Sequence, residues 1–229
     1  MKHSLRSDVE NFPVTVSAGS VDLAADVSLP HAARGLVVFA HGSGSSRHSP
    51  RNRFVAEVIN QGGVGTMLID LLTAEEEVVD SQTAGLRFDI PLLGERLGAI
   101  TDWVGQQRRF AHLSLGYFGA STGAAAALLA AAERPTVVRA VVSRGGRPDL
   151  AGPALPQVLA PTLFIVGGED GVVLDLNREA MAQLPRHTKK KLEVIPGATH
   201  LFEEPGTLDQ VAMLATAWFR EYLCPIASA

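Results

Sequence analysis

The sequence predicts an α/β protein whose core is a mainly parallel, twisted β-sheet with helices on both faces. Short, continuously apolar segments such as 35–40 (GLVVFA) are typical of strands buried on both sides. Between them lie longer segments with apolar residues three or four positions apart, as amphipathic helices require. This alternation is typical of parallel sheets, because a helix usually connects one parallel strand to the next.

The first half of the chain begins with two segments of alternating polarity around Gly19-Ser20, which predict an antiparallel hairpin with one solvated face. The acidic stretch from Leu71 to Asp89 has no strand period, so it forms either a helical excursion or a functional loop over a site, and its motion as a lid stays open. The expected elements are hairpin strands 12–17 and 21–29, strand 35–40, a helix that Ser49 caps and Pro50 begins, strand 64–69, and a helix carrying Leu93, Leu97, Ile100 and Val104.

The second half repeats the strand-helix alternation and brings the total to about eight strands. The expected elements are a strand ending before Gly119, a helix to about 132, strand 137–142, a short helix, strand 162–166, a helix carrying Leu176, Ala180 and Leu184, strand 191–195, and a C-terminal helix carrying Trp218. No internal repeat, linker-like stretch or connection long enough for a large cap is visible, so we expect a single domain over residues 1–229.

Composition narrows the classes of function. The formal net charge is −4 and no long Lys/Arg run occurs, which argues against a nucleic-acid-binding surface. The single cysteine excludes an intrachain disulfide, and no spacing of His and carboxylates indicates a metal, so we expect neither metal nor cofactor. The N-terminal residues lack the apolar core of a signal peptide, and no apolar run is long enough to span a membrane. A cytoplasmic location away from membranes is therefore expected.

The candidate chemistry centres on Ser121, within Gly119-Ala120-Ser121-Thr122-Gly123. A strand pattern ends at this pentapeptide and an alanine-rich helix pattern follows directly, which is the arrangement of a nucleophile elbow. GxSxG also occurs by chance in chains rich in glycine and serine, so its context carries the argument. We expect Ser121 to be a catalytic nucleophile, in preference to a simple turn serine.

A serine hydroxyl needs a base, usually a histidine oriented by a carboxylate. Asp170 and His200 each follow a predicted buried strand, so both are expected at the same edge of the sheet as Ser121. The order Ser121, Asp170, His200 is the one expected for a triad on this kind of sheet. Glu169, next to Asp170, and Asp149, after the preceding strand, are the alternative carboxylates.

An acyl tetrahedral intermediate also needs two N–H donors for its oxyanion. The amide of Thr122, at the start of the elbow helix, is one candidate. The other should come from the loop after His41, with Ser43 favoured and Gly44 as the alternative. His41 precedes the nucleophile in the chain, so a role in bracing this loop is favoured over a role as base.

With these residues placed, the chain resembles the α/β-hydrolases, and within them the small bacterial dienelactone-hydrolase-like proteins, which occur alone or fused to phosphoribosyltransferase-like domains. The resemblance implies the α/β-hydrolase fold and a Ser-His-Asp triad at Ser121, His200 and Asp170. One departure matters: dienelactone hydrolases use a cysteine nucleophile where this chain has Ser121, so a general carboxylic ester is the safer substrate. The resemblance covers almost the whole chain and rests on AHGSGSSRHSPRN (40–52), GLRFDIPLL (85–93), GYFGASTGAAAALLAA (116–131), RGGRPDLA (144–151), FIVGGEDGVVLDLN (164–177) and IPGATHLFEEPG (195–206).

The predicted function is hydrolysis of carboxylic esters with small or medium acyl groups through an acyl-enzyme on Ser121. The expected partner is a small-molecule ester, and the oligomeric state stays open, a homodimer included. A thioesterase or amidase would use the same triad. A non-catalytic ligand-binding module on this fold is a different class, which the filled triad argues against.

Overall fold

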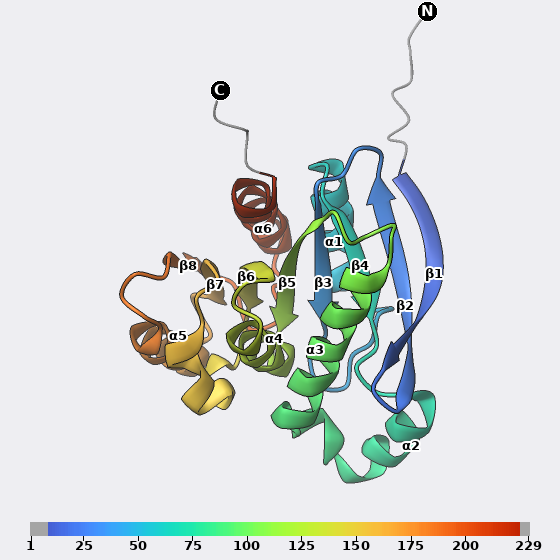
Figure 1. The fold of residues 1–229 in the computed structure, drawn as a ribbon. Helices are drawn as coiled ribbons and strands as arrows, with labels where there is room; N and C mark the ends of the chain where they lie inside the picture. Colours follow the sequence, from blue (N-terminus) through green and yellow to red (C-terminus); the bar gives the residue numbers. More distant parts are fainter. Residues whose placement is uncertain (1–8, 225–229) are drawn as a thin grey trace, which may run out of the picture.

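A computed structural model describes residues 9–224, which fold around one eight-stranded sheet (Figure 1). Residues 1–8, part of the segment expected to lack a signal peptide, lie outside the described range. The elements are, in chain order, β1 (Val9–Ala18), β2 (Val21–Pro30), β3 (Gly35–Ala40), α1 (Pro50–Gln61), β4 (Gly65–Ile69), α2 (Ala74–Thr83), the 3₁₀ segment η1 (Leu86–Phe88), α3 (Ile90–Gln106), β5 (Ser114–Ala120), α4 (Thr122–Glu133), β6 (Val138–Arg144), the 3₁₀ segment η2 (Pro148–Gln157), β7 (Thr162–Gly167), α5 (Gly171–Gln183), β8 (Lys190–Ile195) and α6 (Thr207–Leu223).

The strand order is β1-β2-β4-β3-β5-β6-β7-β8. The hairpin strands β1 and β2 pair antiparallel, and β2 pairs antiparallel with β4, whereas every other neighbouring pair is parallel. The predicted mainly parallel sheet with an N-terminal antiparallel hairpin is therefore confirmed, and the hairpin forms one edge of the sheet (Figure 1). Because β5 lies between β3 and β6, the turn after β5 has a loop from each of these strands beside it.

Two apolar clusters fill the molecule, one on each face of the sheet. One packs α3, α4 and α5 against the sheet and includes Tyr117 of β5. The other packs α1 and α6 and includes Phe39 and Phe118, whose rings stack with centroids 4.7 Å apart. Adjacent residues of β5 thus face opposite clusters, which is why this strand reads as continuously apolar.

Polar side chains cap the starts of α1 and α2, and the cap at Ser49 is the one that the sequence predicts. The Ser49 hydroxyl accepts a hydrogen bond from the Asn52 amide at 3.4 Å, and Pro50 is the first residue of α1. The stretch 71–89 is a helical excursion, since α2 and η1 occupy most of it. A capping box between Thr73 and Glu76 begins α2. Glu76 also forms an ion pair with Arg96 of α3, so α2 is attached to the body of the protein.

Within residues 9–224, no helix is both long enough and apolar enough to cross a bilayer. Over the same range, no three His, Cys, Asp or Glu side chains gather closely enough to hold a metal ion.

Candidate active site

Ser121 lies in the turn that joins β5 to α4, at the carboxyl end of the central strand. Its backbone has φ 51° and ψ −121°, a conformation that side-chain-bearing residues rarely adopt and that costs on the order of 1–3 kcal/mol. The Ser121 N–H donates to the Arg144 carbonyl at 3.3 Å, and its own carbonyl accepts from Arg147 N at 3.0 Å. The end of β6 and the loop after it thus hold the strained turn in place.

The elbow requires its two glycines because backbone atoms of neighbouring segments approach them closely. A methyl group at Gly123 would lie 2.2 Å from the Ala40 carbonyl oxygen and 2.5 Å from that of His41. A methyl group at Gly119 would lie 2.4 Å from the Cα of Ala124. The first turn of α4 therefore packs so closely against β3 and β5 that no side chain larger than the hydrogen of glycine fits at these two positions, as expected for a serine between two glycines.

His200 and Asp170 meet through a short hydrogen bond of 2.6 Å between Nδ1 and Oδ2. Asp170 follows β7 and His200 follows β8, as the sequence predicts. A carboxylate only accepts hydrogen bonds, so Nδ1 carries the proton and Nε2 is left as the basic nitrogen. The side chain of Asp170 is 16% exposed and that of His200 39%, which leaves the ring accessible while its orienting partner is shielded.

The alternative carboxylates do not reach the histidine. Asp149 accepts two hydrogen bonds from the Arg147 guanidinium, at 2.9 and 2.8 Å. Glu169 is exposed to solvent. Of the three carboxylates considered from the sequence, Asp170 is thus the one in contact with His200.

Ser121 and His200 contact the same turn after β6. A methyl group at Gly145 would lie 3.6 Å from Cε1 of His200, and the Arg147 N–H donates to the Ser121 carbonyl. Among residues 9–224, the Ser121 hydroxyl forms no direct hydrogen bond with the His200 ring. Such bonds are often long before substrate binds and tighten in the reacting complex. The structure therefore joins His200 to Asp170 directly, and both His200 and Ser121 contact the turn after β6.

The loop after β3 lies against the elbow. The Ser43 N–H donates to Oγ1 of Thr122 at 3.0 Å, so this amide points at the first residue of α4. A methyl group at Gly42 would lie 3.0 Å from Cβ of Ser121. Gly44, the alternative donor, has φ +68° and faces the Arg87 guanidinium, whose Nη1 a methyl group there would approach to 3.5 Å.

His41 braces this loop, as expected from its place in the chain. Its Nε2 accepts a hydrogen bond from the Leu71 amide at 3.1 Å. Its Nδ1 lies 3.0 Å from the Gly42 carbonyl and therefore carries the proton in this pairing. Both ring nitrogens are occupied in holding backbone, so His41 is not free to act as a base.

Sequence reasoning missed Arg144, whose carbonyl accepts the Ser121 N–H. Its side chain is buried, donates to Oδ1 of Asn52 at 3.1 Å and lies over the ring of Phe202. Burial, with a smaller contribution from Arg51, lowers the pKa of Arg144 to about 10. The group is still a cation at neutral pH. An arginine at a strand end gives no sequence signal that separates this buried position from a solvated one.

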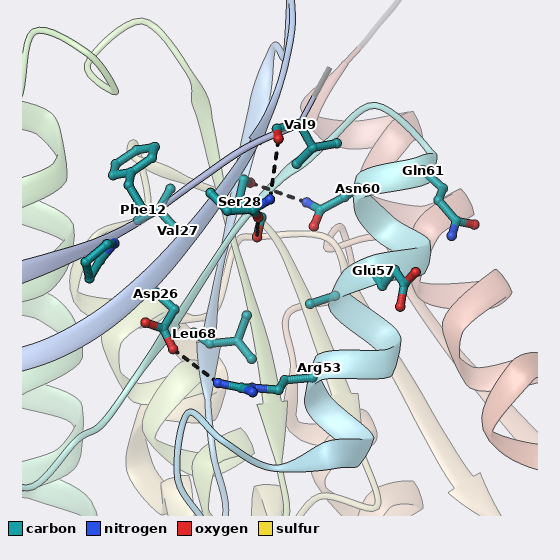
Figure 2. A pocket seen from close by; sticks show the side chains of 13 residues that line it. Val9, Phe12, Asp26, Val27, Ser28, Arg53, Glu57, Asn60, Gln61 and Leu68 are labelled. Carbon is teal, nitrogen blue, oxygen red and sulfur yellow. Dashed lines mark hydrogen bonds and ion pairs between the residues drawn. The ribbon is translucent and has the colours of Figure 1, made fainter. Parts of the chain in front are cut away.

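Cavity size alone does not locate the site. A narrow cavity beside the oxyanion loop is lined by His41, Ser43, Leu71, Leu93 and Thr122, among others. A much larger groove of about 680 Å³ lies between α1 and the hairpin (Figure 2). Some of its polar groups are paired with one another, Arg53 with Asp26 and Asn60 with the Ser28 carbonyl. The groove lies away from the elbow, whose strained serine marks the candidate site.

Several known proteins are similar to this chain in sequence or in structure. A sequence profile of the Dienelactone hydrolase family matches residues 87–221. A crystal structure of a dienelactone hydrolase from Anabaena variabilis is 59% identical, with a TM-score of 0.92 over 94% of this chain and 99% of that one. Two Mycobacterium tuberculosis proteins with a provisional phosphoribosyl transferase name are 59% identical over 92% of this chain. The chain spans about half, 46%, of the length of these curated relatives.

Structures with much lower identity share the fold. Est1E from Butyrivibrio proteoclasticus is 16% identical with a TM-score of 0.75, over 91% of this chain and 98% of that chain. XC6422 from Xanthomonas campestris, described as an α/β serine hydrolase without a lid, is 20% identical with a TM-score of 0.73, over 96% and 97% of the two chains. The α/β-hydrolase fold expected from the resemblance is therefore confirmed.

Proposed function

The chain belongs to the dienelactone hydrolase family, and from this premise we propose that it is a serine hydrolase that cleaves carboxylic esters of small or medium acyl groups. The observation that carries the proposal is the hydrogen bond between His200 and Asp170. It lies beyond the carboxyl ends of the parallel strands, as does Ser121 in its strained elbow. Family membership supports hydrolysis, whereas the ester substrate and the role of each residue are our inference.

The proposed reaction proceeds through an acyl-enzyme. Nε2 of His200 takes the proton of Ser121, and Oγ attacks the ester carbonyl to form a tetrahedral intermediate. His200 then gives that proton to the leaving alcohol, and the same ring activates water to release the acid. Asp170 holds the ring in the tautomer that leaves Nε2 basic and stabilises the imidazolium that forms.

The oxyanion is bound by the amides of Ser43 and Thr122. The Thr122 N–H belongs to the first turn of α4, where backbone donors lack partners within the helix and the helix dipole favours negative charge. The Ser43 amide points at the same residue. Each such donor contributes roughly 10²–10³ in kcat in serine hydrolases.

The preference for small acyl groups rests on the narrow cavity beside this loop, which is lined by Leu71, Leu72 and Leu93. The leucines suit a short acyl chain, Glu77 and Arg87 line the rest of the cavity, and little room lies between the loop and α2. Phosphoribosyl transfer is not proposed, because more than half of the length of the relatives with that name lies outside the match.

A panel of p-nitrophenyl esters, matched thioesters and anilides, with acyl chains of two to about twelve carbons, tests the proposal. We expect hydrolysis of acetyl and butyryl esters, a decline with longer chains, and no turnover by Ser121→Ala. Thioesters or anilides cleaved faster than esters would overturn the assigned leaving group. If no substrate were hydrolysed in a Ser121-dependent way, the proposal that the protein is an enzyme would be wrong, and a ligand-binding module would be favoured.

A further inference from the structure

The side chain of Thr122 lies between the oxyanion loop and the first turn of α4. Thr122 is only 3% exposed, and its Oγ1 accepts the hydrogen bond of the Ser43 amide at 3.0 Å. The backbone N–H of the same residue begins α4. The hydroxyl is therefore next to both amides to which the proposed function assigns the oxyanion.

Within residues 9–224, the proton of this hydroxyl has no hydrogen-bond acceptor. A hydroxyl has one proton and two lone pairs, and the Ser43 amide occupies one lone pair. Threonines within helices can donate to the carbonyl four residues earlier, as the buried Thr101 does to Leu97 and the half-buried Thr216 does to Ala212. Thr122 is the first residue of its helix, so the residue four positions earlier is in β5 and offers no such carbonyl.

We propose that the Thr122 hydroxyl is a third hydrogen-bond donor to the oxyanion. It acts beside the Thr122 amide and the Ser43 amide, whose single proton is then shared between Oγ1 and the oxyanion in a three-centre hydrogen bond. This inference rests on the proposed function and makes Thr122 a catalytic residue through its side chain. A buried donor that has no acceptor among residues 9–224 can donate to a negative charge that develops only during the reaction, and so stabilise the transition state.

The Ser43 amide strengthens this donor. A hydroxyl that accepts a hydrogen bond becomes a better donor through its own proton, because the two bonds polarise each other. When Ser121 adds to the ester, the π electron pair moves to the carbonyl oxygen, and the Thr122 O–H donates to that oxygen. The proton stays on Oγ1 throughout, and the hydrogen bond weakens again when the carbonyl re-forms.

Three variants of the full chain test the proposal. Thr122→Val keeps the shape of the side chain and removes the hydroxyl, whereas Thr122→Ser keeps the hydroxyl. Thr188→Val is the matched control, because Thr188 is similarly buried but its hydroxyl donates to the Val158 carbonyl, away from the elbow. We expect Thr122→Val to lower kcat for p-nitrophenyl acetate by about 10²-fold with KM changed by less than about twofold. Thr122→Ser should recover most of the loss, and Thr188→Val should keep the wild-type kcat.

A second readout separates charge stabilisation from a structural role. A trifluoromethyl ketone with a ¹³C-labelled carbonyl adds to the nucleophile and forms a hemiketal oxyanion, whose pKa is followed by NMR. Loss of a donor should raise that pKa in Thr122→Val by at least about one unit. An unchanged hemiketal pKa, a Thr122→Ser as impaired as Thr122→Val, or a Thr122→Val as active as wild type would overturn the inference. A wild type that fails to hydrolyse esters would instead overturn the proposed function on which it rests.

Discussion

Replacement of Gly123 by alanine tests whether the elbow is as tightly packed as its geometry indicates. The added methyl would lie 2.2 Å from the Ala40 carbonyl oxygen, where contacts of a real Cβ are essentially never below 3.0 Å. The two elements must therefore separate by at least 3.0 − 2.2 = 0.8 Å. The opposing atoms are backbone carbonyls of β3 and its loop, so no side-chain rotation can relieve the contact.

The expected loss of stability is near the upper end of the usual cost of overpacking, about 3 kcal/mol. For a chain of this length, each kcal/mol lowers Tm by about 2–4 °C, so Tm should fall by about 6–12 °C. The shift also displaces the Thr122 amide relative to Ser121. Misplacement of about 1 Å in an active site costs on the order of 10² in rate, so kcat should fall about 100-fold.

Thermal unfolding followed by circular dichroism, together with kcat on p-nitrophenyl acetate, measures both effects. Gly105→Ala is the matched control, because a methyl there meets no atom within 4 Å on the exposed side of α3. That control should be more stable by about 0.4–1 kcal/mol. If Gly123→Ala melted and reacted like Gly105→Ala, the tight elbow and the reasoning built on it would be wrong.

Two further predictions concern charged side chains. Asp170→Asn should lower kcat by about 10³–10⁴ with little change in Tm, because the wrong imidazole tautomer is then held. Glu169→Gln is its control, and equal losses in the two variants would contradict the assignment. The Arg96 guanidinium holds the pKa of Glu76 below its usual 4.5, so this carboxylate stabilises the fold above pH 4.5 and loses that contribution as pH falls through the lowered value. Glu76→Gln should thus unfold at a lower Tm than wild type at pH 7, with the gap closing towards pH 3; a gap independent of pH would refute the ion pair.

Local patterns predicted most of the elements, because strand and helix periods depend on neighbouring residues. The hairpin, the helix start at Ser49 and the strands leading to Ser121, Asp170 and His200 were all visible in the chain. Parallel strands end at one edge, so three loops far apart in sequence were expected to converge, and His200 does contact Asp170. The stretch 71–89 stayed open because its T-x-x-E capping box is short and its apolar pattern weak.

Features that depend on tertiary distance were beyond prediction. The antiparallel pairing of β2 with β4 follows from how the hairpin packs, and no residue of β4 signals it. The Ser43 amide and the Thr122 hydroxyl are 79 positions apart, and their hydrogen bond depends on one side-chain rotamer. Arg144 and Asn52 are 92 positions apart, and only the folded chain shows that the guanidinium is buried.

The most direct test of the central claim, that Ser121 is the nucleophile, is covalent labelling by a fluorophosphonate followed by intact-mass and peptide mass spectrometry. We predict one phosphonyl adduct per wild-type chain, located on the peptide that contains Ser121, and none on Ser121→Ala. His200→Ala should label far more slowly, because the serine then lacks its base. An unlabelled wild-type protein, or equal labelling of Ser121→Ala, would contradict the account.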